Sequence, residues 1–418
     1  MEAVANSLSP DSPLPSRAWQ TVALLWFVAC FNYLARVMIM NMHGSVISAI
    51  PMTEAQFGLL SSVFLWVYGA LSPLAGFMSD RFGRRRVIVT SVLIWSTVTC
   101  LTGLAKTFGE LITMRALMGV SESCYFPAAL ALISEYHRGP TRSFATGLHM
   151  TGLLIGASVA GLAGWVAEVR SWNFTFFLVG AVGIAYGIFL AFTLRDAPPR
   201  EPETGQAAAD GPIRFGSALA SLFASGSFLL VLLFCCMSGA IGYAVIGWMP
   251  AYLQEAFHLH QGAAGFSTTG YVNLSDLAGV LVGGILADRW SRTQIRARIY
   301  VLAIGYCAAA PGIYLAANPN VFAFVALGMI LWGLASGACD SNFMPVLCLT
   351  VDRRFRATAY GVTNFFVSVC GGFSVYGAGL LRDRHVDFGH ILHVTAFALI
   401  ICPILLFLIK PRPELVGT

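Results

Sequence analysis

A basic turn, Gly76-Phe-Met-Ser-Asp80-Arg81-Phe-Gly83-Arg84-Arg85-Arg86, joins two long apolar runs in the first quarter of this chain. A related turn, Gly284-Ile-Leu-Ala-Asp288-Arg289-Trp-Ser-Arg292, joins two apolar runs in the second half. A Gly-x-x-x-Asp-Arg turn at equivalent places in two halves of a chain indicates an internal duplication. We therefore expect two related sets of membrane helices, each with a basic turn after its second helix.

The composition is that of a membrane protein. Of the 418 residues, 57% are hydrophobic and only 11% are charged, whereas soluble domains carry about 25% charged residues. Repeated apolar runs of about 20 residues are typical of transmembrane helices. The net charge of +5 does not indicate a nucleic-acid partner, because the basic residues lie in short turns between apolar runs. The ten cysteines lie within these runs and form no Cys-x-x-Cys pair, so we expect no disulfide and no metal site.

Twelve apolar spans are predicted, so the expected fold class is an all-α polytopic membrane protein with two six-helix halves. The spans cover residues 19–42, 55–78, 87–105, 109–134, 143–167, 172–194, 219–254, 262–287, 298–317, 321–350, 357–381 and 388–409. A Pro-rich polar stretch, residues 195–218, is expected to be a cytoplasmic linker between the halves. It divides the chain into a tail (1–18), an N-terminal half (19–194), a C-terminal half (219–410) and a second tail (411–418).

The basic residues outside the spans predict the orientation. They concentrate in alternate turns: Arg17, Arg81, Arg84, Arg85, Arg86, Arg138, Arg142, Arg195, Arg200, Arg214, Arg289, Arg292, Arg296, Arg298, Arg353, Arg354, Arg356, Lys410 and Arg412. The turns on the other side hold Lys106, Arg170, Arg382 and Arg384. Because cytoplasmic loops carry an excess of basic residues, we expect both termini in the cytoplasm and the protein in the cell (inner or plasma) membrane.

A second repeated pattern supports the duplication. Span four contains Glu122-Ser-x-x-x-Pro127 and span ten contains Asp340-Ser-x-x-x-Pro345. Each pattern is followed by Arg-x-x-Ala-x-Gly, at residues 142–147 and 356–361.

The basic turn resembles the loop signature of the major facilitator superfamily, Gly-x-x-x-Asp-Arg-x-Gly-Arg-[Lys/Arg], although the second copy lacks the glycine that corresponds to Gly83. The resemblance implies two halves related by an axis along the membrane normal, with a substrate site between them at mid-depth. It also implies an inner-gate role, rather than substrate contact, for the turn residues Gly76, Asp80, Arg81, Asp288 and Arg289.

Ionisable residues inside the spans are the strongest indicators of a site, because a charge at the bilayer centre costs at least about 2.5–3.5 kcal/mol. In span one, Asn32 and Tyr33 lie about one helical turn before Arg36, on the same face. In span four, Arg115 and Glu122 stand seven residues apart on one face. We expect these side chains to look into a central cavity, where a guanidinium can bind a carboxylate through two hydrogen bonds.

This pattern, Asn-Tyr-x-x-Arg in span one with Arg-x-x-x-Gly-x-x-Glu in span four, resembles the anion:cation symporters, which include carriers of hexonates, hexuronates and sialate. The resemblance implies that Arg36 and Arg115 bind or gate an organic anion and that Glu122 takes part in proton coupling. It places Tyr68 and Asn364 in the pocket. We expect Glu122 and the substrate to compete for Arg115, so that protonation of Glu122 frees this arginine.

The chain departs from that pattern at Ala35, where the family usually has Asp. Two other acids within spans, Asp276 and Asp340, are therefore predicted as further proton-coupling groups, and Asn273 lies one turn before Asp276 as a further polar pocket residue. By contrast, His43 and His149 are expected to be packing residues.

The expected function is import of a small organic anion, a sugar acid or other carboxylate, with protons as the coupling ion and no other cofactor. The related spinster and drug-exporter branches leave export of an amphiphile as an alternative. A sensor without transport activity stays open as well, whereas a membrane enzyme is disfavoured because the histidines lack catalytic or ligand spacing. No Gly-x-x-x-x-Gly-Lys-[Ser/Thr] stretch for ATP is present. The partners expected are the anion and the lipid bilayer, for a monomeric protein without nucleic acid.

Overall fold

The computed structural model describes residues 16–137, 141–197, 215–318, 321–352 and 355–410. Within these ranges, the side chains of residues 16, 73, 75–77, 79, 80, 143, 215 and 357 are not described. The predicted tails lie almost wholly outside the described residues, as does most of the predicted linker. The described chain contains twelve helices or helix combinations that are long and apolar enough to cross a membrane, which confirms the predicted fold class.

The N-terminal half consists of α2 (Ser16–Val37), η1 (Met38–Met42), α3 (His43–Ala49), α4 (Glu54–Phe82), α5 (Arg84–Thr102), α6 (Phe108–Ser123), α7 (Tyr125–Tyr136), α8 (Arg142–Val159), α9 (Leu162–Val169) and α10 (Trp172–Thr193). The C-terminal half consists of α11 (Phe215–Ala224), α12 (Gly226–Phe257), α13 (Gln261–Ser291), α14 (Ala297–Ala316), α15 (Phe322–Cys348), α16 (Arg356–Asp383) and α17 (Phe388–Leu408).

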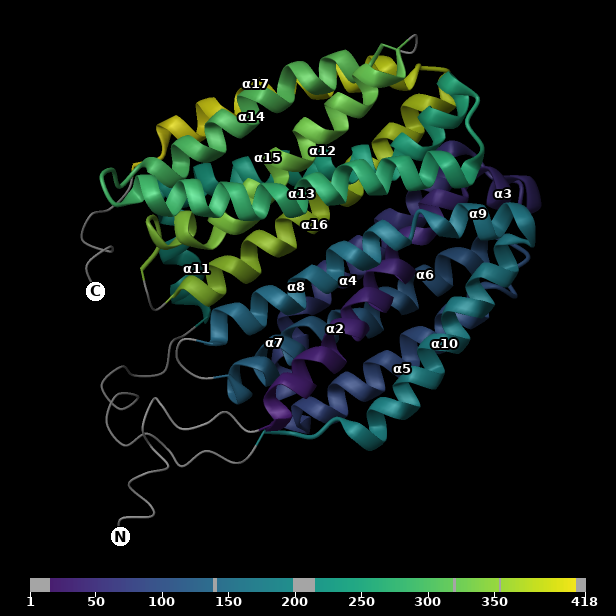
Figure 1. Cartoon of the computed structure of the whole chain (residues 1–418), viewed down its shortest axis with the longest axis horizontal. Helices are drawn as coiled ribbons and strands as arrows, with labels where there is room; N and C mark the ends of the chain where they lie inside the picture. Colours follow the sequence, from purple (N-terminus) through teal and green to yellow (C-terminus); the bar gives the residue numbers. More distant parts are fainter. Residues whose placement is uncertain (1–15, 138–140, 198–214, 319–320, 353–354, 411–418) are drawn as a thin grey trace.

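The two halves form two bundles that lie side by side (Figure 1). The interface between them is made by α4 against α16 and by α8 and α9 against α13. We call the end of the molecule that holds the Gly83 turn the basic end, and the end where α3 leads into α4 the far end. In Figure 1 the far end lies at the right, where the two bundles converge.

Four predicted spans differ from a single helix, and the fifth span is divided between α8 and α9 at Ala160 and Gly161. The first continues beyond residue 42 through η1 and α3 to Ala49. The fourth is divided at Cys124, since Pro127 has no N–H to bond the carbonyl group four residues earlier. The seventh begins at Gly226 rather than at residue 219, because α11 is a separate short helix and Ser225 caps the start of α12 through its hydroxyl group.

The basic turn is shorter than the sequence suggested. Helix α4 continues through Asp80 and Arg81 to Phe82, so the connection to α5 is Gly83 alone, with φ at +86°. This backbone region favours glycine because a Cβ atom would be strained there. The Asp196 carboxylate accepts a hydrogen bond of 2.8 Å from the backbone N–H of Arg85 and so caps the start of α5.

The interface between the halves is closely packed on the far side of the membrane centre. A Cβ atom at Gly58 would lie 2.8 Å from the Val375 carbonyl oxygen, and one at Gly379 would lie 2.6 Å from that of Glu54. By contrast, a Cβ atom at Gly147 or Gly361, both near the basic end, would have open space around it. Small residues therefore let the helix backbones approach each other toward the far end.

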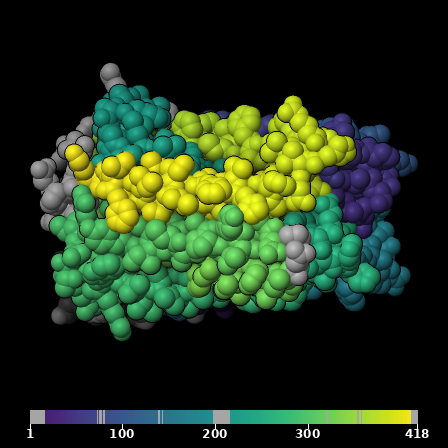
Figure 2. All heavy atoms as spheres, turned by 90° about the horizontal axis from the view of Figure 1, so that it is seen from above, coloured from purple at the N-terminus to yellow at the C-terminus, as the bar shows by residue number. Residues whose placement is uncertain are grey.

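The face of the C-terminal half that points away from the N-terminal half is apolar. Figure 2 shows α17, in yellow, lying along this face beside α14, in green. Its most exposed large side chains are Val394, Phe397, Ile400, Ile404, Phe407 and Leu408. Such a continuous apolar surface suits contact with lipid tails.

Candidate functional site

Arg36 and Glu122 form an ion pair at the middle of the N-terminal half. The Arg36 Nε and Nη2 atoms donate hydrogen bonds of 3.3 and 3.1 Å to the Oε2 atom of Glu122. The Glu122 side chain is fully buried, whereas that of Arg36 is 10% exposed. The remaining nitrogen, Nη1, makes no hydrogen bond to the described residues. The pair therefore keeps one donor group of Arg36 open to a ligand.

Three aromatic rings surround the Arg36 guanidinium group. Its central carbon lies 4.7, 4.9 and 4.5 Å from the ring centroids of Tyr33, Phe64 and Tyr68. Each ring attracts the cation electrostatically and restricts its position. Phe64 was not predicted as a site residue, although its spacing of four from Tyr68 places both on one face of α4, where the rings stack at 5.8 Å.

Arg115 does not pair with Glu122, contrary to the predicted competition for this arginine. Its Nε donates to the Leu60 carbonyl oxygen and its Nη2 to that of Arg36, both at 3.2 Å. Arg36 stands at the end of α2, where carbonyl groups lose their helical partners, so its carbonyl can accept this bond. With only 1% of its surface exposed, Arg115 holds the backbone that carries Arg36.

Asn32 lies one turn from Arg36 and is buried. Its side chain interacts with the Glu122 carboxylate, but neither Asn32 Nδ2 nor Glu122 Oε1 has a partner within hydrogen-bond distance among the described residues. Both atoms thus leave hydrogen-bonding capacity beside the ion pair, as expected of a polar binding region.

The C-terminal half contributes two carboxyl groups. Asp340, in the second half of α15, is exposed and interacts electrostatically with Tyr33 of the other half and with Tyr243. Tyr243 also interacts with Arg36, so it lies between the cation of one half and the carboxyl group of the other. Asp340 therefore faces an accessible space between the halves.

Asp276 is the second carboxyl group, on α13. It is 6% exposed, interacts electrostatically with Asp340, and its Oδ1 atom has no hydrogen-bond partner among the described residues. Asn273, one turn earlier, is also buried, and Asn364 on α16 is half-buried. The structure shows no contact of these two asparagines with Arg36 among the described residues.

Two of the predicted gating residues, Asp288 and Arg81, contact residues of their own halves, and Arg81 lies 5.7 Å from the ring centroid of Phe82. Asp288 pairs with Arg298 at 2.6 Å, and the same arginine donates a hydrogen bond to Asn342. Arg81 and Arg289 are exposed, whereas the side chains of Gly76 and Asp80 lie outside the described residues.

The halves are joined at the far end by two equivalent helix caps. Asp383, at the end of α16, accepts hydrogen bonds of 2.8 and 3.1 Å from the backbone N–H groups of Glu54 and Ala55, at the start of α4. Glu168, near the end of α9, accepts bonds of 2.6 and 3.3 Å from the N–H groups that begin α13. Each half thus caps the second long helix of the other half.

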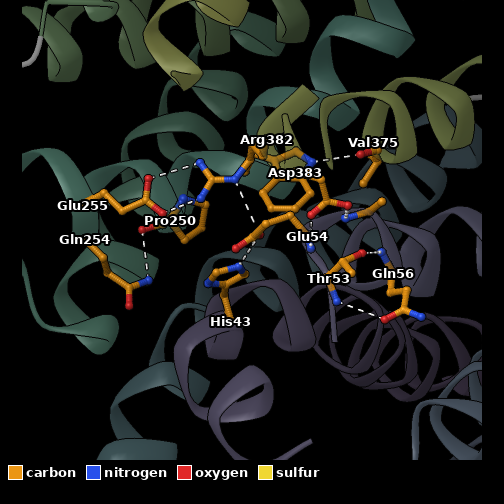
Figure 3. A network of polar contacts seen from close by, with 12 residues as sticks. His43, Thr53, Glu54, Gln56, Pro250, Gln254, Glu255, Val375, Arg382 and Asp383 are labelled. Carbon is orange, nitrogen blue, oxygen red and sulfur yellow. Dashed lines mark hydrogen bonds and ion pairs between the residues drawn. The ribbon is translucent and has the colours of Figure 1, made fainter. Parts of the chain in front are cut away.

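A network of charged side chains accompanies the first cap (Figure 3). His43 Nε2 lies 2.8 Å from Glu54 Oε2, and Arg382 Nε lies 3.5 Å from the same oxygen. Arg382 also pairs with Glu255 and lies 5.1 Å from the centroid of the Trp248 ring. His43 was expected to be a packing residue, but its ring nitrogen belongs to this network.

Sequence comparison identifies the family. The sequence pattern of the Major Facilitator Superfamily matches residues 25–375. The chain belongs to the Major Facilitator Superfamily. It is therefore a multi-pass membrane transporter of this superfamily and not an enzyme.

The chain is similar in sequence to proteins with different names. The "Probable sulfoacetate transporter SauU" of Cupriavidus necator is 28% identical over 87% of this chain and 86% of its own length. The "Probable L-galactonate transporter" of Escherichia coli is 25% identical over 95% of this chain and 91% of its own length. The "Protein spinster" of Drosophila melanogaster is also 25% identical, over 85% of this chain and 62% of its own length.

The fold agrees with a solved superfamily structure. A crystal structure of a bacterial homologue of the human lysosomal transporter spinster, in an inward-facing and unoccupied conformation, superimposes with a TM-score of 0.77. It covers 95% of this chain and 96% of that chain at 19% sequence identity. At this level of sequence identity the likeness shows the fold, and the substrate has to be argued from the side chains of the site.

Proposed function

We propose that this superfamily transporter imports a small organic anion, a sugar acid or another carboxylate, together with protons. The observation that supports the proposal is the Arg36–Glu122 pair, in which a guanidinium inside the membrane is held by one buried carboxylate oxygen and keeps a donor nitrogen free. Among the relatives, those named for sulfoacetate and L-galactonate carry small organic anions.

The pair suggests how proton and anion are coupled. A substrate carboxylate and Glu122 compete for the Arg36 guanidinium, because both accept its N–H groups. Protonation of Glu122 removes the negative charge that neutralises Arg36, so Arg36 can bind the anion through two charge-assisted hydrogen bonds. Loss of the anion then favours release of the proton. The competition thus concerns Arg36, while Arg115 positions it through the Arg36 carbonyl group.

Asp340 and Asp276 are the groups proposed to carry further protons. An ionised Asp340 would repel an anion held by Arg36, since both face the space between the halves. Protonation of this pair of acids lowers that repulsion as the substrate enters. Asp340 and Asp276 would then supply the titratable carboxyl group that is missing beside Arg36, where this chain has Ala35.

The orientation is proposed from the basic residues, which put the basic end in the cytoplasm. The helix caps and the close glycine contacts join the halves at the far end. With this orientation, the structure corresponds to an inward-facing state. Opening of the far end and closure of the basic end would give the outward-facing state of an alternating-access cycle.

The experiment is uptake into proteoliposomes under an imposed inward proton gradient. Labelled galactonate, gluconate, glucuronate, sialate, lactate, glutamate and sulfoacetate would be tested separately. Arg36→Ala, Arg36→Lys and Glu122→Gln would be compared with wild type. Arg170→Gln serves as a matched control, because Arg170 is an exposed arginine at the far end. Size-exclusion chromatography checks that each variant is folded.

We expect one anion to accumulate only with the gradient. Arg36→Ala should abolish its uptake, and Arg36→Lys should weaken it because lysine offers a point charge instead of a planar pair of donors. Glu122→Gln should retain exchange of labelled for unlabelled anion but lose accumulation. Wild-type uptake by Arg36→Ala, with Arg170→Gln equally active, would refute the proposed anion site.

The second candidate function is export of an amphiphile, which the sequence similarity to spinster favours. An exporter of this kind should move a lipid-like or zwitterionic substrate while none of the anions accumulates. It should also tolerate Arg36→Ala better than an anion carrier, because apolar contacts would supply most of its binding free energy.

A further inference from the structure

The two interfaces that close the far end differ in their ability to take up protons. Beside the contact of α9 with α13, the Gln261 amide of α13 bonds Ser45 of α3: its Oε1 accepts from the Ser45 backbone N–H at 3.0 Å, and its Nε2 donates to the Ser45 hydroxyl at 2.9 Å. An amide and a hydroxyl group do not titrate in the physiological range. Between α4 and α16, the corresponding place holds His43, Glu54 and Arg382.

His43 and Arg382 compete for the same partners. Both lie within ion-pair distance of the Oε2 atom of Glu54, His43 at 2.8 Å and Arg382 at 3.5 Å. Both also contact the Trp248 ring, at 5.9 Å for His43 and 5.1 Å for Arg382. His43 and Glu54 belong to the N-terminal half, and Arg382 and Glu255 to the C-terminal half, so Arg382–Glu54 is the one ion pair of this described network that joins the halves.

The charges decide the direction of the effect. With neutral His43, the N-terminal half presents the net negative charge of Glu54 to Arg382, and the halves attract each other. With protonated His43, this side of the interface becomes neutral, Glu54 is satisfied within its own half, and the imidazolium repels Arg382. When the halves separate, Arg382 keeps Glu255 as its partner, so each half retains one acid–base pair.

We propose that the His43–Glu54 pair is a proton-binding site that controls the far end: a proton bound at His43 weakens the Arg382–Glu54 contact and favours opening. The charged groups that face this site are Glu54 from α4, Arg382 and Asp383 from α16, and Glu255 from α12. The His43 and Glu54 side chains are 13% and 26% exposed, so protons from the far side can reach them.

The inference rests on the proposed alternating-access cycle, because the far end has to open in it. A proton taken up there would act before the coupling groups at mid-membrane, by increasing the population of carriers that are open to substrate and protons. Histidine suits this role because its charge changes near neutral pH.

The test measures the distance between the halves at the far end in the full-length protein in lipid nanodiscs. Spin labels are introduced as non-natural amino acids at Ala49 and Arg384, which are exposed on opposite halves, so that the ten native cysteines stay in place. Distance distributions are recorded by pulsed electron paramagnetic resonance at pH 8 and pH 5.5, without substrate.

In the wild type, acidification should raise the fraction of the long distance about twofold to fivefold, the range expected for weakening one partly exposed ion pair. His43→Gln should stay closed at both pH values, and His43→Lys, which fixes the positive charge, should favour the long distance at both. His260→Gln is the matched control, because His260 is an exposed histidine of the far end outside the network, and it should respond like the wild type.

A His43→Gln protein that keeps the wild-type pH response would overturn the inference, and so would closure on acidification. Arg382→Gln separates this failure from failure of the proposed function. If Arg382→Gln opens the far end while the His43 variants behave like wild type, the cycle stands and the proton site is refuted. If no variant populates the long distance at any pH, the alternating-access proposal itself fails.

Discussion

Removal of Arg36 should destabilise the protein mainly by leaving Glu122 without a counter-ion. The Glu122 side chain is fully buried, and its Oε2 atom receives both of its hydrogen bonds from Arg36. Loss of one partner of a buried ion pair costs about 3–5 kcal/mol. We therefore expect Arg36→Met to lower the free energy of unfolding by about this amount.

Removing both charges should be much less costly. Arg36→Met combined with Glu122→Gln should lower the free energy of unfolding by only about 1–2 kcal/mol, the size of the lost cation–π contacts with the surrounding rings. The double variant should thus be more stable than Arg36→Met alone by about 1–4 kcal/mol, and the single Glu122→Gln variant completes the double-mutant cycle that isolates the interaction of the pair. The matched cycle uses Arg115→Met, which should show a smaller interaction with Glu122→Gln than Arg36→Met does, because Arg115 interacts with Glu122 electrostatically but donates its hydrogen bonds to backbone carbonyl groups.

The assay is reversible unfolding by SDS in mixed micelles, followed by far-ultraviolet circular dichroism and intrinsic fluorescence. The reasoning is refuted if Arg36→Met and the double variant are equally unstable. It is equally refuted if Arg115 shows the larger interaction with Glu122, since that would restore the pairing that the sequence suggested.

Two further predictions concern contacts between helices, the first between the halves and the second within the C-terminal half. In the same spin-label measurement, the distance between the halves at the far end should lengthen in Glu54→Arg and in Arg382→Glu. The double variant restores the opposite charges and should return this distance to the wild-type value. Gly337→Ala should lower the thermal unfolding midpoint, because the new Cβ atom would overlap the carbonyl oxygen of Asp276. Gly361→Ala should leave the midpoint unchanged or raise it slightly, because its Cβ position has open space around it. Equal midpoints for the two alanine variants would contradict this packing.

The helical fold could be predicted from the sequence because membrane spans are long apolar runs, and this signal does not depend on how the helices pack. The ends of the helices were less certain. Asp80 and Arg81 were assigned to a turn because they are charged, yet α4 extends through them. Hydropathy marks where a helix leaves the apolar region, whereas the helix itself ends at Gly83, where the backbone changes direction.

The site was predicted in part. Asn32, Tyr33, Arg36 and Glu122 lie together, as the spacing within each span suggested, but the pairing of Glu122 with Arg36 could not be derived. Spacing along one helix favours Arg115 as the partner, whereas the actual pairing depends on how α2 and α6 lie against each other. Phe64 was missed because an aromatic residue in an apolar span looks like ordinary packing until its ring is seen against a guanidinium group.

The exchanged helix caps at the far end set the energetic scale of the conformational change. A side-chain cap contributes about 0.5–2 kcal/mol to a helix, and water can bond the same N–H groups once the halves part. Two caps therefore favour the closed far end by only a few kcal/mol. A ligand with a modest difference in affinity between two conformations can shift an equilibrium of that size, so this arrangement leaves both conformations thermally accessible.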